Sequence, residues 1–258
     1  MSTLITQGFV ASFLAGSATG IGGFAILLTK QLSTRLKDTM LGFSAGVMIS
    51  ASFFSLIIPS LEFGEKIYHS TALAALITCF SILLGVGAIW LFEHYAPHEH
   101  FIINESPKRK STLSKIWLFV IAMTIHNLPE GLSVGVSFGS GELAQATSLA
   151  IAIGLQNIPE GLAVSASLYA AGYRRLFSAV IALASGLVEP LGGLVGATLV
   201  TLSRPTLPWA LAFSAGAMLF VISHEIIPET HRNGHQNAAT FGMMIGIVLM
   251  LFLDVALV

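Results

Sequence analysis

Long apolar runs separated by short polar stretches dominate the hydrophobic pattern of this 258-residue chain. A helix needs about 20 mostly apolar residues to cross a bilayer, and eight runs are of about that length. The runs are continuously apolar and do not alternate, so they predict helices and exclude a transmembrane β-barrel. We therefore expect an all-α integral membrane protein with a single polytopic transmembrane domain over residues 1–258. The predicted spans are about Leu4–Thr29, Thr39–Ser60, Thr71–Phe92, Leu113–Phe138, Ala144–Ala171, Leu176–Leu202, Leu207–Pro228 and Ala238–Val255.

The loops between these spans carry lysine and arginine unequally. Of the 12 cationic residues, 10 lie in the loops after the first, third, fifth and seventh spans, and only Lys66 and Arg204 lie in the other loops. Under the positive-inside rule the cation-rich loops face the cytoplasm, which places both termini outside a cell (inner) membrane. The longest of these loops, residues 93–112, is then a cytoplasmic loop that bears histidines.

The composition agrees with a protein surrounded by lipid. Charged residues make up only 10% of the chain and hydrophobic residues 54%, whereas a soluble domain has about 25% charged residues. This composition excludes a soluble enzyme, a nucleic-acid-binding protein and a disordered chain, and it makes the lipid bilayer a partner. The net charge is −1, and the single cysteine, Cys79, can form neither a disulfide framework nor a cysteine-based zinc site.

Two sequence motifs occur twice. Residues 126–132 (HNLPEGL) recur as residues 156–162 (QNIPEGL), and residues 41–48 (LGFSAGVM) recur as residues 211–218 (LAFSAGAM). Because the spans alternate in direction, the two members of each pair lie in helices that run oppositely. Inverted repeats of this kind are a signature of secondary transporters, whose site lies at the midplane. The pattern therefore favours a transport site at the midplane between the fourth, fifth and sixth spans.

Three carboxylates lie near the centres of predicted spans: Glu130, Glu160 and Glu189. An ionised carboxylate is costly at that depth, and no lysine or arginine is expected beside these three. Either they are protonated and hydrogen-bonded, or they hold a cation. A proline adjoins each glutamate and removes a helical backbone donor, namely Pro129, Pro159 and Pro190.

The spacing of side chains around two of these glutamates favours a metal. His126 and Glu130 are one helical turn apart on the same face, and Gln156 and Glu160 repeat that spacing in the next span. Imidazole and carboxylate groups together suit zinc, iron and other divalent first-row metals, while amide oxygens add weaker ligands. The candidate ligands in these two spans are His126, Asn127, Glu130, Gln156, Asn157 and Glu160.

The paired motif resembles the signature of the ZIP family of zinc/iron permeases, in its bacterial form. It reads His-Asn-x-Pro-Glu-Gly from His126 and x-Asn-x-Pro-Glu-Gly from Gln156, and the likeness covers essentially the whole chain. The resemblance implies transport of a divalent metal, zinc first and then iron, manganese or cadmium, as cargo and not as a cofactor. It implies that the six candidate ligands form the transport site, joined by Glu189 and Met48. It also implies that spans 1, 4, 5 and 6 move against spans 2, 3, 7 and 8.

Two positions depart from the family pattern. Gln156 stands where many members have histidine, and Asn157 stands where some members that bind paired metals have aspartate. Both changes remove a strong ligand from the site. Glu130 and Glu160 balance the charge of one divalent cation, and Glu189 adds a third negative charge unless it is protonated or helps to hold a second cation. We favour one tightly held metal, with Glu189 neutral or bridging through water to a weak second site.

Further histidines and glutamates lie on the predicted cytoplasmic side. They form two loose clusters that could accept metal leaving the membrane, or sense it and slow transport. The alternative is a hydrophilic loop that binds no metal. The clusters consist of Glu93, His94, His98 and His100 after the third span, and of His224, Glu225, His231 and His235 at the end of the seventh.

Together these features predict a carrier that moves a divalent metal into the cytoplasm by alternating access. The same features are also compatible with two other functions, namely an intramembrane metal-dependent hydrolase and a metal-selective channel. The repeats argue against the hydrolase, because an enzyme does not need such symmetry. Whether the chain forms a homodimer also stays open.

Overall fold

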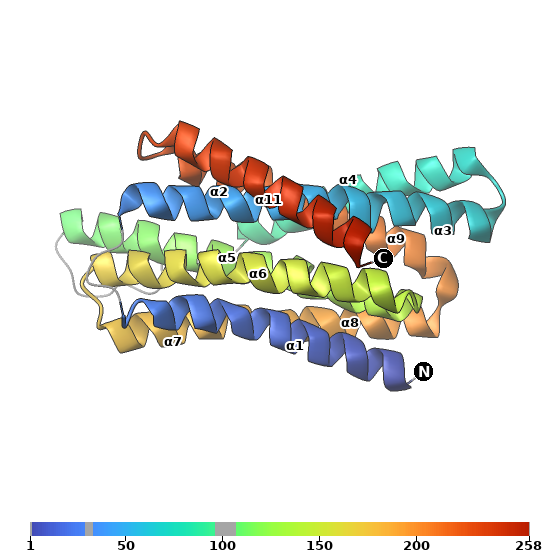
Figure 1. The fold of residues 1–258 in the computed structure, drawn as a ribbon, viewed down its shortest axis with the longest axis horizontal. Coiled ribbons are helices and arrows are strands. Elements are labelled where there is room, and N and C mark those ends of the chain that lie inside the picture. The colour runs from blue at the N-terminus through green and yellow to red at the C-terminus, as the bar shows by residue number, and fades with distance from the viewer. Residues whose placement is uncertain (1, 29–32, 96–106, 258) are drawn as a thin grey trace.

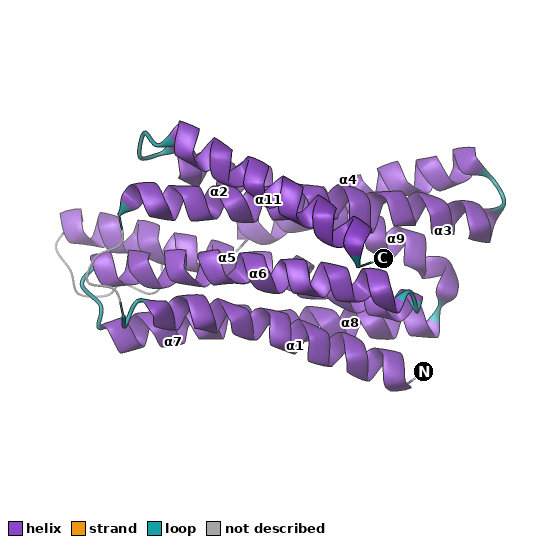
Figure 2. Cartoon of the chain, viewed as in Figure 1, coloured by secondary structure: helices purple, strands orange, loops and turns teal. Residues whose placement is uncertain are grey.

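The computed structural model describes residues 2–28, 33–95 and 107–257, and every regular element within them is a helix (Figure 2). The elements are α1 (Ser2–Ala25), α2 (Thr34–Ala51), the π-helix η1 (Ser52–Ile57), α3 (Ile58–Tyr68), α4 (Thr71–Tyr95), α5 (Pro107–Ser140), α6 (Leu143–Ala170), α7 (Arg175–Gly186), α8 (Glu189–Leu202), the 3-10 turn η2 (Arg204–Thr206), α9 (Leu207–Val221), the π-helix η3 (Ile222–Ile226), α10 (Ile227–His231) and α11 (Gln236–Ala256).

Eight helical stretches in the described part of the chain are long and apolar enough to cross a membrane, as predicted. Three of them combine shorter elements: α2 with η1 and α3, α7 with α8, and η2 with α9, η3 and α10. The stretches lie along the long axis of the molecule and alternate in direction (Figure 1). Because their number is even, the N- and C-termini lie at the same end of the molecule (Figure 1).

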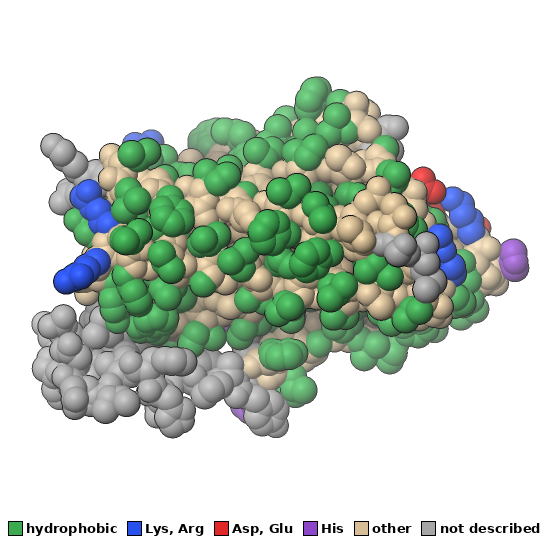
Figure 3. All heavy atoms as spheres, turned by 90° about the horizontal axis from the view of Figure 1, so that it is seen from below, with side chains coloured by type: hydrophobic (Ala, Val, Ile, Leu, Met, Phe, Trp, Pro, Cys, Tyr) green, Lys and Arg blue, Asp and Glu red, His purple; other side chains and the backbone are tan. Residues whose placement is uncertain are grey.

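Apolar side chains cover the long sides of the molecule. On the face drawn in Figure 3, hydrophobic side chains spread over the middle and charged side chains gather at the two ends. Large apolar side chains such as Leu28, Phe241 and Val255 are at least 72% exposed. An apolar surface of this extent suits contact with lipid and would be unfavourable in water.

The second span begins earlier than its apolar run. α2 starts at Thr34 and not near Thr39, because the Ser33 hydroxyl accepts a hydrogen bond from a backbone N–H of the first turn at 3.2 Å. Asp38 therefore lies inside α2, where it is fully buried. This carboxylate is buried like the three glutamates but lies close to the end of its span.

The helices that carry the third and fourth spans extend beyond the spans, and the third membrane-crossing stretch has the predicted bounds Thr71–Phe92. α4 continues to Tyr95, and α5 begins at Pro107. The predicted loop 93–112 therefore starts and ends within helices. Its centre, residues 96–106, lies outside the described residues.

The prolines beside the three glutamates differ in their effect. α5 and α6 continue through Pro129 and Pro159 without a break. The sixth span, in contrast, is interrupted at residues 187–188, and Pro190 is the second residue of α8. The interruption places Glu189 at the start of a helix in the interior of the molecule.

Two other spans contain a π-helix. Each begins eleven residues after the first leucine of its LGFSAGVM or LAFSAGAM segment. The N–H of Ile58 donates to the carbonyl of Phe53 after η1, and the N–H of Ile227 donates to that of Ile222 after η3. A proline is the second residue of the α-helix that follows each of them, and it lacks the N–H that would continue an α-helical pattern.

Close helix packing divides the spans into two groups. The first group consists of α1, α5, α6 and α7–α8, and the second of α2–η1–α3, α4, α9–η3–α10 and α11. Every helical glycine of the described residues at which an added Cβ would contact another span faces a span of its own group. At many of these positions the Cβ would overlap a backbone carbonyl, so glycine is needed for the close approach. Examples from four helix pairs are Gly161 against Thr19, Gly131 against Glu189, Gly242 against Thr39 and Gly216 against Ile82.

An arginine caps a helix at the end of the molecule that carries the termini. Arg204 in η2 donates from Nη1 to the carbonyl oxygen of Ser140 at 2.6 Å and to that of Gly139 at 3.4 Å. These two residues end α5, so the guanidinium meets carbonyls that have no donor within the helix.

Candidate metal centre

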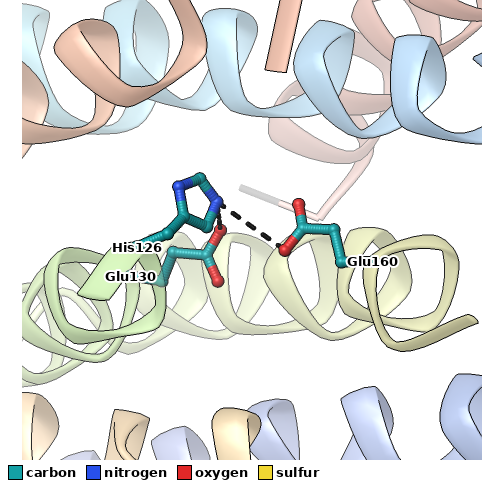
Figure 4. Close-up of side chains that lie close together, drawn as sticks. All are labelled: His126, Glu130 and Glu160. Atoms are coloured by element: carbon teal, nitrogen blue, oxygen red, sulfur yellow. Dashed lines mark ion pairs between the residues drawn. The ribbon is translucent and has the colours of Figure 1, made fainter. Parts of the chain in front are cut away.

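A histidine and two glutamates meet on the side of α5 and α6 that faces the second group (Figure 4). His126 and Glu130 come from α5 and Glu160 from α6, and each is at most 1% exposed. His126 Nε2 lies 3.1 Å from Glu130 Oε1 and 3.6 Å from Glu160 Oε2. One ligand atom of each residue lies within 4.8 Å of the other two, as expected of side chains that share one metal ion. We call these three residues the metal triad.

Each carboxylate of the triad has one oxygen bonded to a neutral side chain. Gln156 donates from its side-chain amide to Glu130 Oε1, and Ser44 of α2 donates from its hydroxyl to Glu160 Oε1. The other oxygen of each carboxylate, Oε2, is buried and has no hydrogen-bond partner. A buried oxygen of this kind is costly unless a cation or a water molecule meets it.

The surroundings of the triad supply further oxygen atoms and no cationic side chain. No lysine or arginine is among the buried residues of the part of the chain that the structure describes. Imidazole, carboxylate and amide oxygen together are a donor set that fits a divalent cation such as Zn²⁺. The amide oxygens that are buried without a hydrogen-bond partner here are Asn127 Oδ1, Gln156 Oε1 and Asn157 Oδ1.

Glu189 and Met48 lie outside the triad. Glu189 is fully buried as the first residue of α8, and its Oε1 accepts a hydrogen bond from Asn157 Nδ2 at 2.6 Å. The same nitrogen donates to the backbone carbonyl of Ala15 at 2.8 Å, so Asn157 joins three spans of the first group. Met48 is fully buried one turn after Ser44, on the same face of α2.

The residues of the predicted cytoplasmic clusters are spread over several elements. The ring of His94 stacks on Trp90 with centroids 5.5 Å apart, and that of His224 stacks on Phe220 with centroids 5.1 Å apart. Among the described side chains, the residues that come close enough to share a metal ion in a group of three are those of the metal triad, and the residues of the predicted cytoplasmic clusters do not form such a group. Outside the described residues lie His98 and His100, together with the side chain of Glu93.

The other two histidines of these clusters already have partners. His231 Nδ1 lies 2.8 Å from the carbonyl oxygen of Ile227. His235 Nδ1 lies 2.8 Å from Asp38 Oδ2, and Asn233 donates to the second oxygen of the same carboxylate at 3.0 Å. The segment between α10 and α11 is thereby fastened to the start of α2.

A cavity of about 670 Å³ lies between α5 of the first group and the η3–α10 segment of the second. Ile125, which precedes His126 in the triad, lines one side, and His224 and Glu225 line the other. The cavity extends to Arg232, beyond the end of α10, and so reaches the end of the molecule opposite the termini.

The sequence does not predict the contact of Ser44 with Glu160 or that of Asp38 with His235. Ser44 stands in a motif of small residues, 116 positions from Glu160, and nothing in the motif distinguishes a packing serine from one that reaches a carboxylate. Asp38 precedes the apolar run that predicts its span. Ser33, a favourable N-cap residue, is the signal that would have extended the helix to include it.

A helical membrane protein with eight spans and a buried cluster of imidazole, carboxylates and amide oxygens has the features of a divalent-metal transporter. Comparison with known proteins identifies the family. Residues 96–254 match the family model described as the ZIP Zinc transporter.

Relatives cover nearly the whole chain. Over 250 residues it is 44% identical to the Zinc transporter GufA of Myxococcus xanthus, which covers 97% of this chain and 98% of that protein. Over 241 residues it is 43% identical to the Zinc transporter ZIPB of Bordetella bronchiseptica, covering 93% and 78%. Over 334 aligned positions it is 31% identical to the Zinc transporter ZIP11 of Homo sapiens, covering 98% of each.

The chain therefore belongs to the ZIP family of zinc transporters, which confirms the resemblance seen in its motifs. It is a multi-pass membrane protein for divalent-metal transport. The relatives are transporters and not enzymes, so they do not support an intramembrane hydrolase.

Proposed function

We propose that the chain is a carrier that moves Zn²⁺ into the cytoplasm by alternating access, with the metal triad as its transport site. The observation that carries the proposal is the meeting of His126, Glu130 and Glu160, fully buried, with unsatisfied carboxylate oxygens and without a cationic side chain. Two carboxylates balance one divalent cation, so the site becomes electrically neutral when the cargo binds.

The two helix groups support alternating access. The triad belongs wholly to the first group, and glycine-mediated packing joins spans only within a group. A boundary without such close packing is the natural place for one rigid body to slide on another. In this proposal the first group binds the metal and moves relative to the second group. This movement exposes the metal first to one side of the membrane and then to the other. The paired motifs in oppositely directed helices also support alternating access, because inverted repeats are typical of carriers of this kind.

The orientation of the chain in this proposal rests on the charge asymmetry of the loops. The cation-rich loops lie at the end opposite the termini, and the cavity between α5 and η3–α10 opens toward that end. In our proposal this end faces the cytoplasm, the termini lie outside the inner membrane, and the metal leaves through the cavity. His224 and Glu225 line that cavity and are placed to receive the departing metal. The remaining members of the proposed cytoplasmic sites are Glu93, His94, His98, His100, His231 and His235.

The other predicted ligands take secondary roles in this proposal. Asn127, Gln156 and Asn157 offer neutral oxygens, and Met48 offers a thioether sulfur from the second group. Glu189 stays bonded to Asn157 beside a site that holds one metal. Zinc is the preferred cargo because its ligand preferences match the triad, and iron, manganese and cadmium are weaker candidates.

The test is uptake of Zn²⁺ by purified protein in sealed vesicles. Glu160→Ala should abolish uptake, because one carboxylate cannot neutralise the cation. Glu142→Ala changes an exposed glutamate immediately before the same helix and should leave uptake unchanged. Normal uptake by a folded Glu160→Ala protein would overturn the transport site.

A second measurement separates a carrier from a metal-selective channel. Vesicles preloaded with unlabelled Zn²⁺ should take up labelled Zn²⁺ faster than empty vesicles if the site alternates between the two sides. With the membrane potential clamped at zero, a channel shows no such acceleration, and this result would replace the carrier with a channel that uses the same triad.

A further inference from the structure

We infer that Ser44 sets the metal selectivity of the triad by holding Glu160 as a ligand that binds through one oxygen. The inference rests on the proposed function, because it concerns the same site. Ser44 is fully buried on α2, and its hydroxyl donates to Glu160 Oε1. It is the contact through which the second helix group touches a carboxylate of the triad in the described structure.

The hydroxyl leaves one oxygen of Glu160 for the metal. Oε1 accepts from Ser44, whereas Oε2 has no hydrogen-bond partner and faces His126 Nε2 at 3.6 Å. Glu130 also accepts a hydrogen bond at Oε1, from Gln156, and its Oε2 is unsatisfied, although here it is Oε1 that lies 3.1 Å from His126 Nε2. With one oxygen from each carboxylate and Nε2 of His126, the triad offers three donor atoms.

A small number of donor atoms favours zinc over larger cations. Zn²⁺ binds with four ligands in most protein sites, three from the protein and one from water where an open position remains. Mn²⁺ prefers six oxygen ligands, and larger hard cations obtain additional ligands by binding carboxylates through both oxygens. The hydrogen bond from Ser44 occupies one lone pair of Oε1 and fixes the orientation of the carboxylate, so it disfavours binding of a metal through both oxygens.

The repeated motif supplies a matched serine with a different partner. Ser214 of α9 occupies the place of Ser44 in the second copy and is equally buried. Its hydroxyl donates to the carbonyl of Ala210, one turn earlier on its own helix, at 2.9 Å. A buried serine in this motif is thus satisfied without any carboxylate, and the bond from Ser44 to Glu160 is specific to the copy that faces the triad.

Replacing Ser44 by alanine should relax the selectivity. The change frees Oε1 of Glu160, so this carboxylate can bind through both oxygens and supply the additional ligand that Mn²⁺ prefers. We expect the ratio of Mn²⁺ to Zn²⁺ uptake to rise about fivefold, which is the effect of one hydrogen bond. Ser214→Ala should keep the wild-type ratio. Ser44→Thr retains a hydroxyl on the same carbon and should also keep it.

The experiment measures initial uptake of Mn²⁺ and Zn²⁺, separately and in competition, by the purified full-length protein in vesicles. An unchanged ratio in Ser44→Ala would overturn the inference, as would equal shifts in the alanine and threonine variants, which would assign the effect to packing. Failure of the proposed function is a separate result, because it requires that Glu160→Ala still transports Zn²⁺. Binding of the two metals to detergent-solubilised Ser44→Ala gives the same ratio test if its uptake is too slow to measure.

Discussion

The neutral partners of the buried carboxylates determine which of them can meet a cation. Glu130 and Glu160 face each other across His126, whereas Glu189 lies 2.6 Å from the amide nitrogen of Asn157. A third carboxylate adds little to the binding of one divalent cation once two others have balanced its charge. Glu189 is also the first residue of α8, where the helix dipole favours a negative charge without a metal.

We expect Glu189→Gln to reduce Zn²⁺ uptake far less than Glu160→Gln. Loss of a triad carboxylate leaves the buried charges unbalanced, which costs about 3–5 kcal/mol and at least about 100-fold in apparent affinity. The change at Glu189 weakens one hydrogen bond, an effect of about fivefold. Uptake rates over a range of Zn²⁺ concentrations, at equal amounts of protein, measure both effects. Equal losses in the two variants would place Glu189 among the ligands and contradict a one-metal site.

At the scale of single helices, the number of spans follows from the apolar runs, but their interruptions depend on contacts between spans. Pro129, Pro159 and Pro190 look alike in the sequence, and only Pro190 adjoins a helix break. At this break Gly186 packs its carbonyl against Gly16 of α1. Such a contact joins residues distant in the sequence, so the sequence pattern does not reveal it.

The parts of the candidate site that depend on local sequence patterns can be predicted, and the parts that depend on contacts between spans cannot. The triad follows from residues one turn apart on α5 and from a motif repeated on α6, which are local patterns. Ser44 enters the site from α2, and the register of α2 against α6 is set by packing along the whole interface. The sequence therefore predicts the ligands and misses the hydroxyl that restrains one of them.

The glycine contacts give a prediction about stability. Gly242→Ala should destabilise the protein by about 1–3 kcal/mol, because the new Cβ would overlap the carbonyl of Thr39 and push α11 from α2. Gly87→Ala is the matched control, since nothing lies within 4 Å of the added Cβ on α4. There alanine should be neutral or slightly stabilising, as it is a better helix former. Thermal unfolding in detergent measures both, and equal melting temperatures would show that the close approach is not required.

At the scale of the whole molecule, Lys37 bridges the two helix groups at the end opposite the termini. Its Nζ lies 3.2 Å from Glu229 Oε1 of its own group and 3.1 Å from Ser167 Oγ of the first group. It also lies 5.2 Å from the centre of the Phe119 ring on α5. The contacts to the first group must change when the groups slide, whereas the contact with Glu229 can persist.

This difference predicts the outcome of chemical cross-linking. In a Cys79→Ala background, cysteines at positions 37 and 167, joined by a short reducible thiol cross-linker, should abolish Zn²⁺ uptake until the link is reduced. Cysteines at positions 37 and 229, joined by the same reagent, should leave uptake unchanged, because both belong to the second group. Uptake assays before and after reduction compare the two pairs. Continued uptake by the linked 37–167 pair would contradict movement between the groups.

The cap on α5 has a consequence for how the chain is inserted during biosynthesis. Insertion machinery retains cationic loops on the cytoplasmic side, and Arg204 and Lys66 are the two exceptions to the charge pattern of this chain. Arg204 is bound to the terminal carbonyls of α5, and Lys66 lies 5.4 Å from the centre of the Phe63 ring. Both cations therefore make contacts in the folded protein, although they lie in the loops where the positive-inside rule disfavours cations. A neutral residue at position 204 would strengthen the signal that orients the nascent chain, but it would leave the end of α5 uncapped.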